Sequence, residues 1–167
     1  MAGLNGRTIV IGLGSPIMSD DAIGLRVSEA VGRLGMPGVD AIQEAAGGLE
    51  VIPMVRGYSF AVIVDAIQTG AHPPGTVMIF DLEDFAGTVA DVPAHDVNLA
   101  TALEVGRRLE PGSMPEAVKL VAVEAADLQT VSEEMTPAVA AAEGAALDAA
   151  LHVIAGFTGL SPTRRAS

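Results

Sequence analysis

The feature that most constrains this chain is an apolar run that leads directly into a glycine-rich turn and an amphipathic stretch. The run covers residues 8–13, the turn starts at Gly12, and the amphipathic stretch covers residues 21–34. A β-branched run bounded by glycines predicts a strand buried on both faces, and apolar residues at helical spacing predict a helix packed on it. The turn ends on two acids, Asp20 and Asp21, where a phosphate-binding loop presents backbone amides or a lysine.

Apolar runs and amphipathic stretches continue to alternate along the chain. Further strands are expected at residues 39–42, 60–64, 76–80 and 118–123, and helices at 47–57, 96–109 and 137–154. The connection over residues 66–75 is shorter than a parallel crossover needs, so the strand after it is expected to be antiparallel or at an edge. The pattern predicts an α/β fold, a three-layer α/β/α sandwich with a mostly parallel, twisted sheet of about five strands.

Two finer expectations follow from the same pattern. Leu49 and Leu109 are assigned to the apolar faces of their helices, and Asp65 to the end of the strand at residues 60–64. Residues 1–155 are expected to form a single α/β domain without a linker, and residues 156–167 a flexible tail.

The composition excludes several classes of function. Acidic residues outnumber basic ones by 21 to 9, and the net charge of −12 argues against a nucleic-acid surface and fits a cation or a basic partner. The lack of cysteine excludes disulfides, thiolate metal sites and a cysteine nucleophile. No apolar run reaches the ~18 residues of a membrane span, and residues 1–7 contain no signal-peptide core, so we expect a cytoplasmic protein.

Acidic residues follow several of the expected strands. Ligands of open α/β sheets bind beyond the carboxyl ends of the strands, where this chain places Asp21, Glu44, Asp65, Glu124 and, at a helix start, His95. Carboxylates do not converge unless some are protonated or a cation joins them, and a set of carboxylates and imidazole suits a divalent first-row metal. Each residue also has an ordinary structural explanation, such as a helix cap for Asp20 or Asp21.

Three short segments are more specific than any single residue. They read IGLGSPIMSDDAIG at residues 11–24, VIVDA at 62–66 and AHDVNL at 94–99, and a Thr-Pro pair follows at 136–137. In order and spacing they resemble the motifs of the hydrogenase maturation proteases, the endopeptidases that trim the large subunit of nickel–iron hydrogenases. The chain departs from the family pattern at Ser15, where Asn is usual, and at residues 43–48, a loop that the family uses to choose its partner.

The resemblance implies a peptide hydrolase of aspartic or metal-dependent type. It implies that the protein removes the C-terminal extension of a nickel-loaded large-subunit precursor, and that Asp21, Asp65 and His95 are both catalytic and metal-binding. The nickel is then carried by the precursor, and the free protease is expected to be a monomer and to hold no metal. Whether the metal or a carboxylate activates the water stays open, as does any contribution of Asp20, Glu44 or Glu124.

Two other functions stay open from the residues alone. A small nucleotide- or metabolite-binding module could use the turn at Gly12, although Asp20 and Asp21 would repel a phosphate. A nickel chaperone could hold the metal with the same three residues and have no peptidase activity. Titration with nucleotides tests the first alternative, and a cleavage assay on nickel-loaded precursor tests the second.

Overall fold

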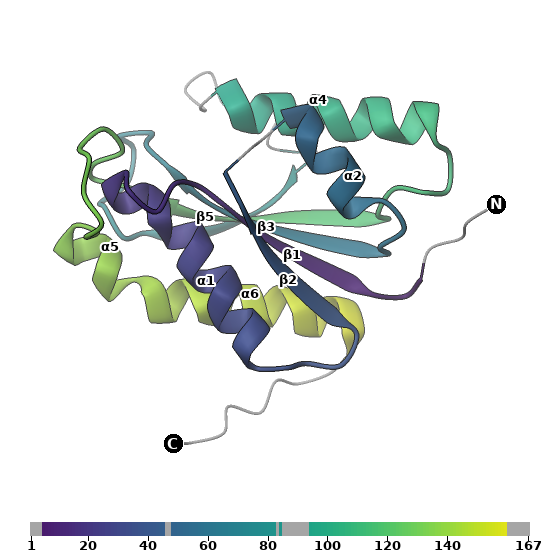
Figure 1. The fold of residues 1–167 in the computed structure, drawn as a ribbon, viewed down its shortest axis with the longest axis horizontal. Coiled ribbons are helices and arrows are strands. Elements are labelled where there is room, and N and C mark those ends of the chain that lie inside the picture. The colour runs from purple at the N-terminus through teal and green to yellow at the C-terminus, as the bar shows by residue number, and fades with distance from the viewer. Residues whose placement is uncertain (1–4, 46–47, 83, 85–93, 160–167) are drawn as a thin grey trace.

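The middle layer of the protein is one five-stranded sheet. The structure, a computed structural model, describes residues 5–45, 48–82, 84 and 94–159, and for residues 94–98 it describes the backbone alone. Its strands lie in the order β2-β1-β3-β5-β4 (Figure 1). All neighbouring strands are parallel except β4 and β5. The strands are β1 Thr8–Leu13, β2 Val39–Glu44, β3 Phe60–Ile67, β4 Val77–Asp81 and β5 Ala117–Glu124. The expected fold class, with its antiparallel edge strand, is confirmed.

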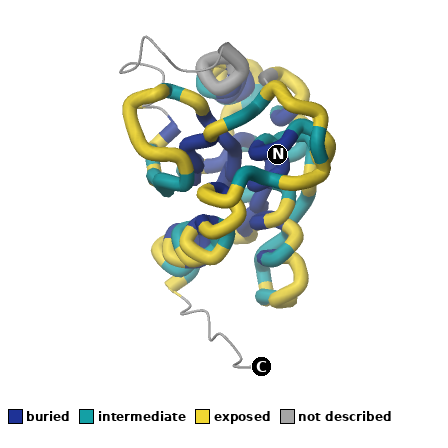
Figure 2. The backbone as a smooth tube through the Cα atoms, turned by 90° about the vertical axis from the view of Figure 1, so that its left-hand side faces the viewer, coloured by how far each residue is buried: buried dark blue, intermediate teal, exposed yellow. Residues whose placement is uncertain are grey.

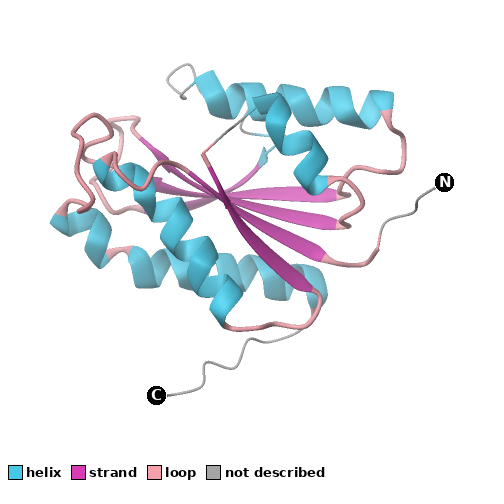
Figure 3. Ribbon diagram, viewed as in Figure 1, coloured by secondary structure: helices cyan, strands magenta, loops and turns pink. Residues whose placement is uncertain are grey.

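Helices cover both faces of this sheet (Figure 3). On one face, the short 3-10 helix η1 (Ser19–Ala22) leads into α1 (Ile23–Arg33), which packs beside α6 (Glu143–Thr158). The short helix α5 (Pro137–Ala141) precedes α6. The other face is covered by η2 (Gly48–Val51), α2 (Ile52–Val55) and α4 (Ala94–Leu109). Among the residues that the structure describes, none of the helices combines the length and apolarity needed to span a membrane.

The strands alternate their side chains between two apolar cores. Val62 and Val64 of β3 contribute to the core under α1 and α6, whereas Ile63 and Ile67 contribute to the core under α2 and α4. Every residue of β1 is buried, as expected for a strand covered on both faces. Figure 2 shows this buried backbone at the centre of the molecule and exposed segments around it.

Several local expectations are wrong. Leu49 and Leu109 are 68% and 75% exposed, because Val51 and Val55 fill the core under η2 and α2 and because Leu109 is the last residue of α4. Asp65 lies inside β3, since pairing with β5 continues to Ile67. The last helix is interrupted at Ala142 and runs beyond residue 154 to Thr158. There Phe157 stacks on Phe60 with ring centroids 4.7 Å apart. Of the tail expected at residues 156–167, residues 156–158 belong to α6, and residues 160–167 lie outside the described residues.

Two glycines allow α1 to lie directly against the sheet. A β-carbon on Gly24 would overlap the carbonyl oxygens of Val64 and Leu13, and one on Gly12 would overlap the carbonyl oxygen of Gly24. The first turn of α1 therefore touches the backbone of β1 and β3. A side chain at Gly12 or Gly24 would not fit into so short a separation. This contact also holds η1, directly before α1, against β3.

We expect Gly24→Ala to lower the free energy of unfolding by about 1–3 kcal/mol or more, because the added methyl meets backbone that cannot rotate away. The matched control is Gly32→Ala in the same helix, where the nearest atom to an added β-carbon is the Ala41 side chain at 3.5 Å, an ordinary contact. That control is expected to gain about 0.5–1 kcal/mol from helix propensity. Urea unfolding of both variants measures the difference, and equal stability of the two would contradict the close approach.

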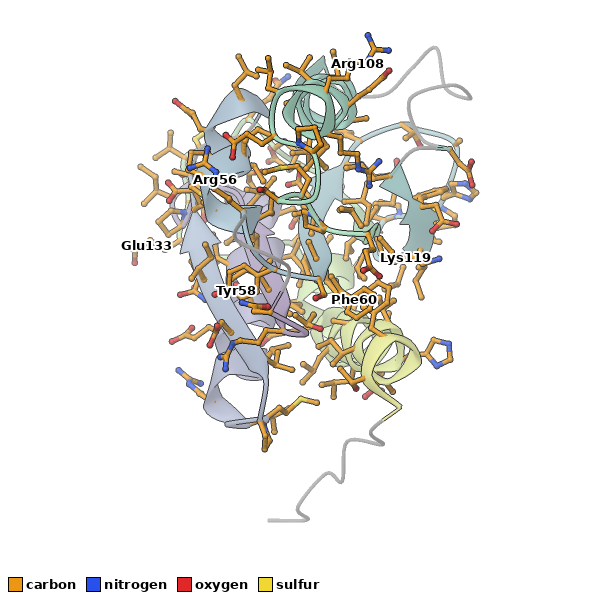
Figure 4. The ribbon with its side chains drawn as sticks, turned by 90° about the vertical axis from the view of Figure 1, so that its right-hand side faces the viewer. Arg56, Tyr58, Phe60, Arg108, Lys119 and Glu133 are labelled. Carbon is orange, nitrogen blue, oxygen red and sulfur yellow. The ribbon has the colours of Figure 1, made fainter. Side chains whose placement is uncertain are left out.

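A polar cluster lies at the end of the sheet where the parallel strands begin, opposite their carboxyl ends. Arg7 donates from Nη2 to Asp40 Oδ1 over 2.7 Å, and Tyr58 Oη donates to Asp40 Oδ2 over 2.7 Å. Figure 4 shows Tyr58 at this edge, with Phe60 at the start of β3. The hydrogen bond from Arg7, followed by that from Tyr58, lowers the pKa of the Asp40 carboxyl below its ordinary value.

This cluster predicts a pH dependence of stability. Because the pKa of Asp40 is lower in the folded than in the unfolded protein, its stabilisation is present at neutral pH and is lost as the pH falls below about 4. Wild type should therefore melt at a higher temperature than Asp40→Asn at pH 7, by a small margin because the pair is solvent-exposed, and the margin should shrink towards pH 3. A margin that stays constant across this pH range would contradict the assignment.

Candidate active site

The turn after β1 presents Asp21. Gly14 has a φ of +143° and packs so closely on the Asp21 carbonyl that a β-carbon would overlap it. The Asp21 N–H donates to the carbonyl of Met18 over 3.1 Å. Its carboxylate Oδ2 accepts the N–H of Ser15 over 2.9 Å. The turn is thus closed on itself, and the partly buried Asp21 side chain is fixed at its end.

Asp65 lies in the adjacent strand. It is 1% exposed and sits in β3 between Ile63 and Ile67, two residues of the core under α2 and α4. Strand alternation directs it to that same face of the sheet. Because η1 contacts β3, Asp21 and Asp65 belong to neighbouring segments near the carboxyl end of the sheet. A buried ionisable group at this edge is a candidate functional group.

His95 is the second residue of α4, but its side chain lies outside the described residues. Its approach to Asp21 and Asp65 therefore stays a prediction. Among the described side chains, no group of three or more His, Cys, Asp or Glu residues is arranged to hold a metal ion.

The expectation that Asp20 caps the helix that begins beside it is wrong. Its side chain makes no capping bond to η1 or α1 and is 0% exposed. Instead, Oδ2 accepts the N–H groups of Ala126 and Asp127, both over 2.9 Å, and Oδ1 accepts the N–H of Thr136 over 2.7 Å. The Thr136 hydroxyl lies 2.9 Å from both oxygens. Asp20 thus organises the loop between β5 and α5, and sequence spacing did not reveal this because the partners are more than 100 residues away.

Glu124 has a similar structural role in another loop. It is buried at the end of β5, and its Oε1 accepts the N–H groups of Thr69 and Gly70 over 2.9 and 2.8 Å. Oε2 accepts the Thr69 hydroxyl over 2.9 Å. Both carboxylate oxygens therefore hold the loop that follows β3. Glu44, by contrast, is partly exposed, and its carboxylate accepts only a 3.2 Å bond from the next residue's N–H among the described contacts.

The geometry defines a three-layer α/β/α domain with acidic residues at the carboxyl edge of its sheet, of which Asp20 and Glu124 hold loops. Residues 25–153 match the sequence profile described as hydrogenase maturation protease. The hydrogenase 2 maturation protease of Escherichia coli (strain K12) is 30% identical over 120 residues, which cover 70% of this chain and 72% of that protein.

Solved structures agree with the sequence comparisons. The hydrogenase-maturating endopeptidase HybD from E. coli has a TM-score of 0.75 and 26% identity, over 90% of this chain and 93% of that one. The nickel–iron hydrogenase maturation protease HybD from Thermococcus kodakarensis shares the fold, with a TM-score of 0.70 at 22% identity over 88% and 98% of the two chains. This chain belongs to the hydrogenase maturation protease family. The profile match contains Asp65 and His95 and begins four residues after Asp21.

We expect Glu124→Gln to lose about 1–3 kcal/mol of unfolding free energy. The substituted amide would lose the charge that strengthens the bonds from the Thr69 and Gly70 N–H groups, and its NH₂ group would replace the oxygen that accepts the Thr69 hydroxyl. Urea unfolding measures the loss, with Glu50→Gln at an exposed position of η2 as the matched control. Equal stability of the two variants would show that the Glu124 contacts do not hold the loop.

Proposed function

We propose that this protein is the endopeptidase that removes the C-terminal extension from the large-subunit precursor of a nickel–iron hydrogenase. Membership of the maturation protease family supports the reaction class, and the E. coli relatives are named as a maturation protease and a maturating endopeptidase. The observation that carries the site is the position of Asp65, buried in β3 beside the segment that ends on Asp21.

The topology supports a place for His95 in the same site. Helix α4 spans about 24 Å and β5 about 26 Å, and a short connection joins the end of the helix to the start of the strand. The first turn of α4 therefore lies towards the edge where the parallel strands end, the side on which α5 begins (Figure 1). One turn after His95, Leu99 is buried in the core on the face of β3 that includes Asp65.

We propose that Asp21, Asp65 and His95 bind the nickel ion carried by the precursor. Carboxylate oxygens and neutral imidazole are suitable ligands for Ni²⁺, and three protein ligands leave positions for groups of the precursor. The metal is then part of the substrate, and its binding reports that the precursor has been loaded. With no cysteine in the chain, the nucleophile we propose is water, deprotonated by a carboxylate or polarised by the nickel.

The hydrogen bonds of the turn count against the nucleotide-binding alternative. The N–H of Gly14 donates to the Glu44 carbonyl over 3.2 Å, and the N–H of Ser15 donates to the Asp21 carboxylate. These amides would have to point at a phosphate in a phosphate-binding turn. Here they are occupied by acceptors of the protein itself, one of which is negatively charged.

The proposal predicts cleavage of nickel-loaded precursor and none of nickel-free precursor, measured by mass spectrometry of the released extension. Asp21→Asn, Asp65→Asn and His95→Ala are each expected to lower the rate by about 100-fold or more while the proteins remain folded. Asp81→Asn is the matched control, because Asp81 pairs with Lys119 at the opposite edge of the sheet.

The outcomes separate the competing functions. If wild-type protein leaves both the nickel-loaded and the nickel-free precursor at full length, the result would favour the nickel-chaperone hypothesis. Equal cleavage of loaded and nickel-free precursor would overturn nickel recognition and leave the peptidase activity standing. Wild-type rates in all three variants would place the active site elsewhere.

A further inference from the structure

Hydrogen bonds join the Asp20 carboxylate to the loop between β5 and α5. The carboxylate accepts from Ala126 and Asp127 at the start of the loop and from Thr136 at its end, so one buried side chain closes the loop. Burial of a carboxylate costs several kcal/mol unless hydrogen bonds replace its hydration. Three backbone N–H groups and a hydroxyl supply that replacement here, and such charge-assisted bonds are stronger than neutral ones.

The loop in turn fixes the backbone that leads to Asp21. The N–H of Ser19 donates to the Ser132 carbonyl over 3.0 Å, and the Ser132 N–H donates to the Ile17 carbonyl over 2.9 Å. The Asp20 N–H donates to the carbonyl of Asp127 over 3.1 Å. These bonds flank a strained position, because Ser19 has a φ of +52°, which is uncommon for a residue other than glycine.

We infer that Asp20 and Thr136 are a pair of positioning residues for Asp21. The inference rests on the proposed function, in which Asp21 contacts the nickel of the precursor. Asp21 follows Asp20 directly, and its carboxylate accepts the N–H of Ser15 in the same turn. Loss of the hydrogen bonds between Asp20 and Thr136 would let the segment from Met18 to Asp20 relax and would move Asp21. A displacement of about 1 Å at a reacting group can cost about 100-fold in rate.

The test uses the hydroxyl of Thr136, which contacts both oxygens of Asp20. Thr136→Val removes this donor and keeps the side-chain shape, whereas Thr136→Ser keeps the donor. Thr69→Val is the matched control, because it removes an equivalent hydroxyl from the second buried carboxylate, Glu124. Two readouts are needed: the ¹H–¹⁵N shifts of the Ser15 and Asp21 amides in the free protein, and kcat and KM for cleavage of nickel-loaded precursor.

We expect Thr136→Val to move both amide signals and to lower kcat by about 10–100-fold with a smaller change in KM, as loss of an orienting partner does. Thr136→Ser should restore the wild-type signals and kcat. Thr69→Val should lose stability yet leave the Ser15 and Asp21 amides in place. If Thr136→Val does not fold, Thr136→Ala removes the same hydroxyl without adding bulk and gives the same readouts.

Wild-type amide signals and wild-type kcat in the folded Thr136 variant would overturn the inference, as would an equal shift of the Ser15 amide in Thr69→Val. A kcat loss that matches the unfolded fraction would also overturn it, because that is a purely structural effect. Failure of the proposed function looks different: wild-type protein would then leave the precursor at full length, and normal processing by Asp21→Asn would remove the role of Asp21. An inactive Asp21→Asn with a normal Thr136→Val removes only the positioning role.

Discussion

The contact that the rest of the structure depends on is the backbone approach of α1 to β1 and β3. Gly12 and Gly24 remove the side chains that would otherwise hold the helix at an ordinary packing distance. Because η1 is continuous with that helix, the contact also fixes where the turn after β1 lies relative to β3. Asp21 in η1 and Asp65 in β3 are therefore placed by one rigid junction.

The acidic residues at this edge of the sheet differ in what their carboxylates contact. Asp20 and Glu124 are buried, accept several backbone N–H groups and hold loops in place. Asp21 is partly buried at the end of its turn, where its carboxylate accepts the N–H of Ser15. The surroundings decide between these contacts, because each carboxylate accepts the N–H groups that the fold places beside it.

The family membership and the geometry support each other at different levels. The sequence profile and the solved relatives identify the fold and the reaction class. The hydrogen bonds add what those comparisons do not state: the loop before Thr136 is joined to the first motif from both directions. This part of the sheet's carboxyl edge is thus built from segments more than 100 residues apart in the chain, joined by buried polar contacts.

The sequence by itself determined the layers, the antiparallel edge strand and the family, because hydrophobic period and motif order are local properties of the chain. It misplaced Leu49 and Leu109, since burial depends on which neighbouring side chains fill a core first. It also could not assign Asp20 or Glu124, whose partners are brought near only when strands assemble into a sheet. Only the tertiary structure decided which acids hold loops, because that depends on which backbone N–H groups lie within 3 Å of each carboxylate.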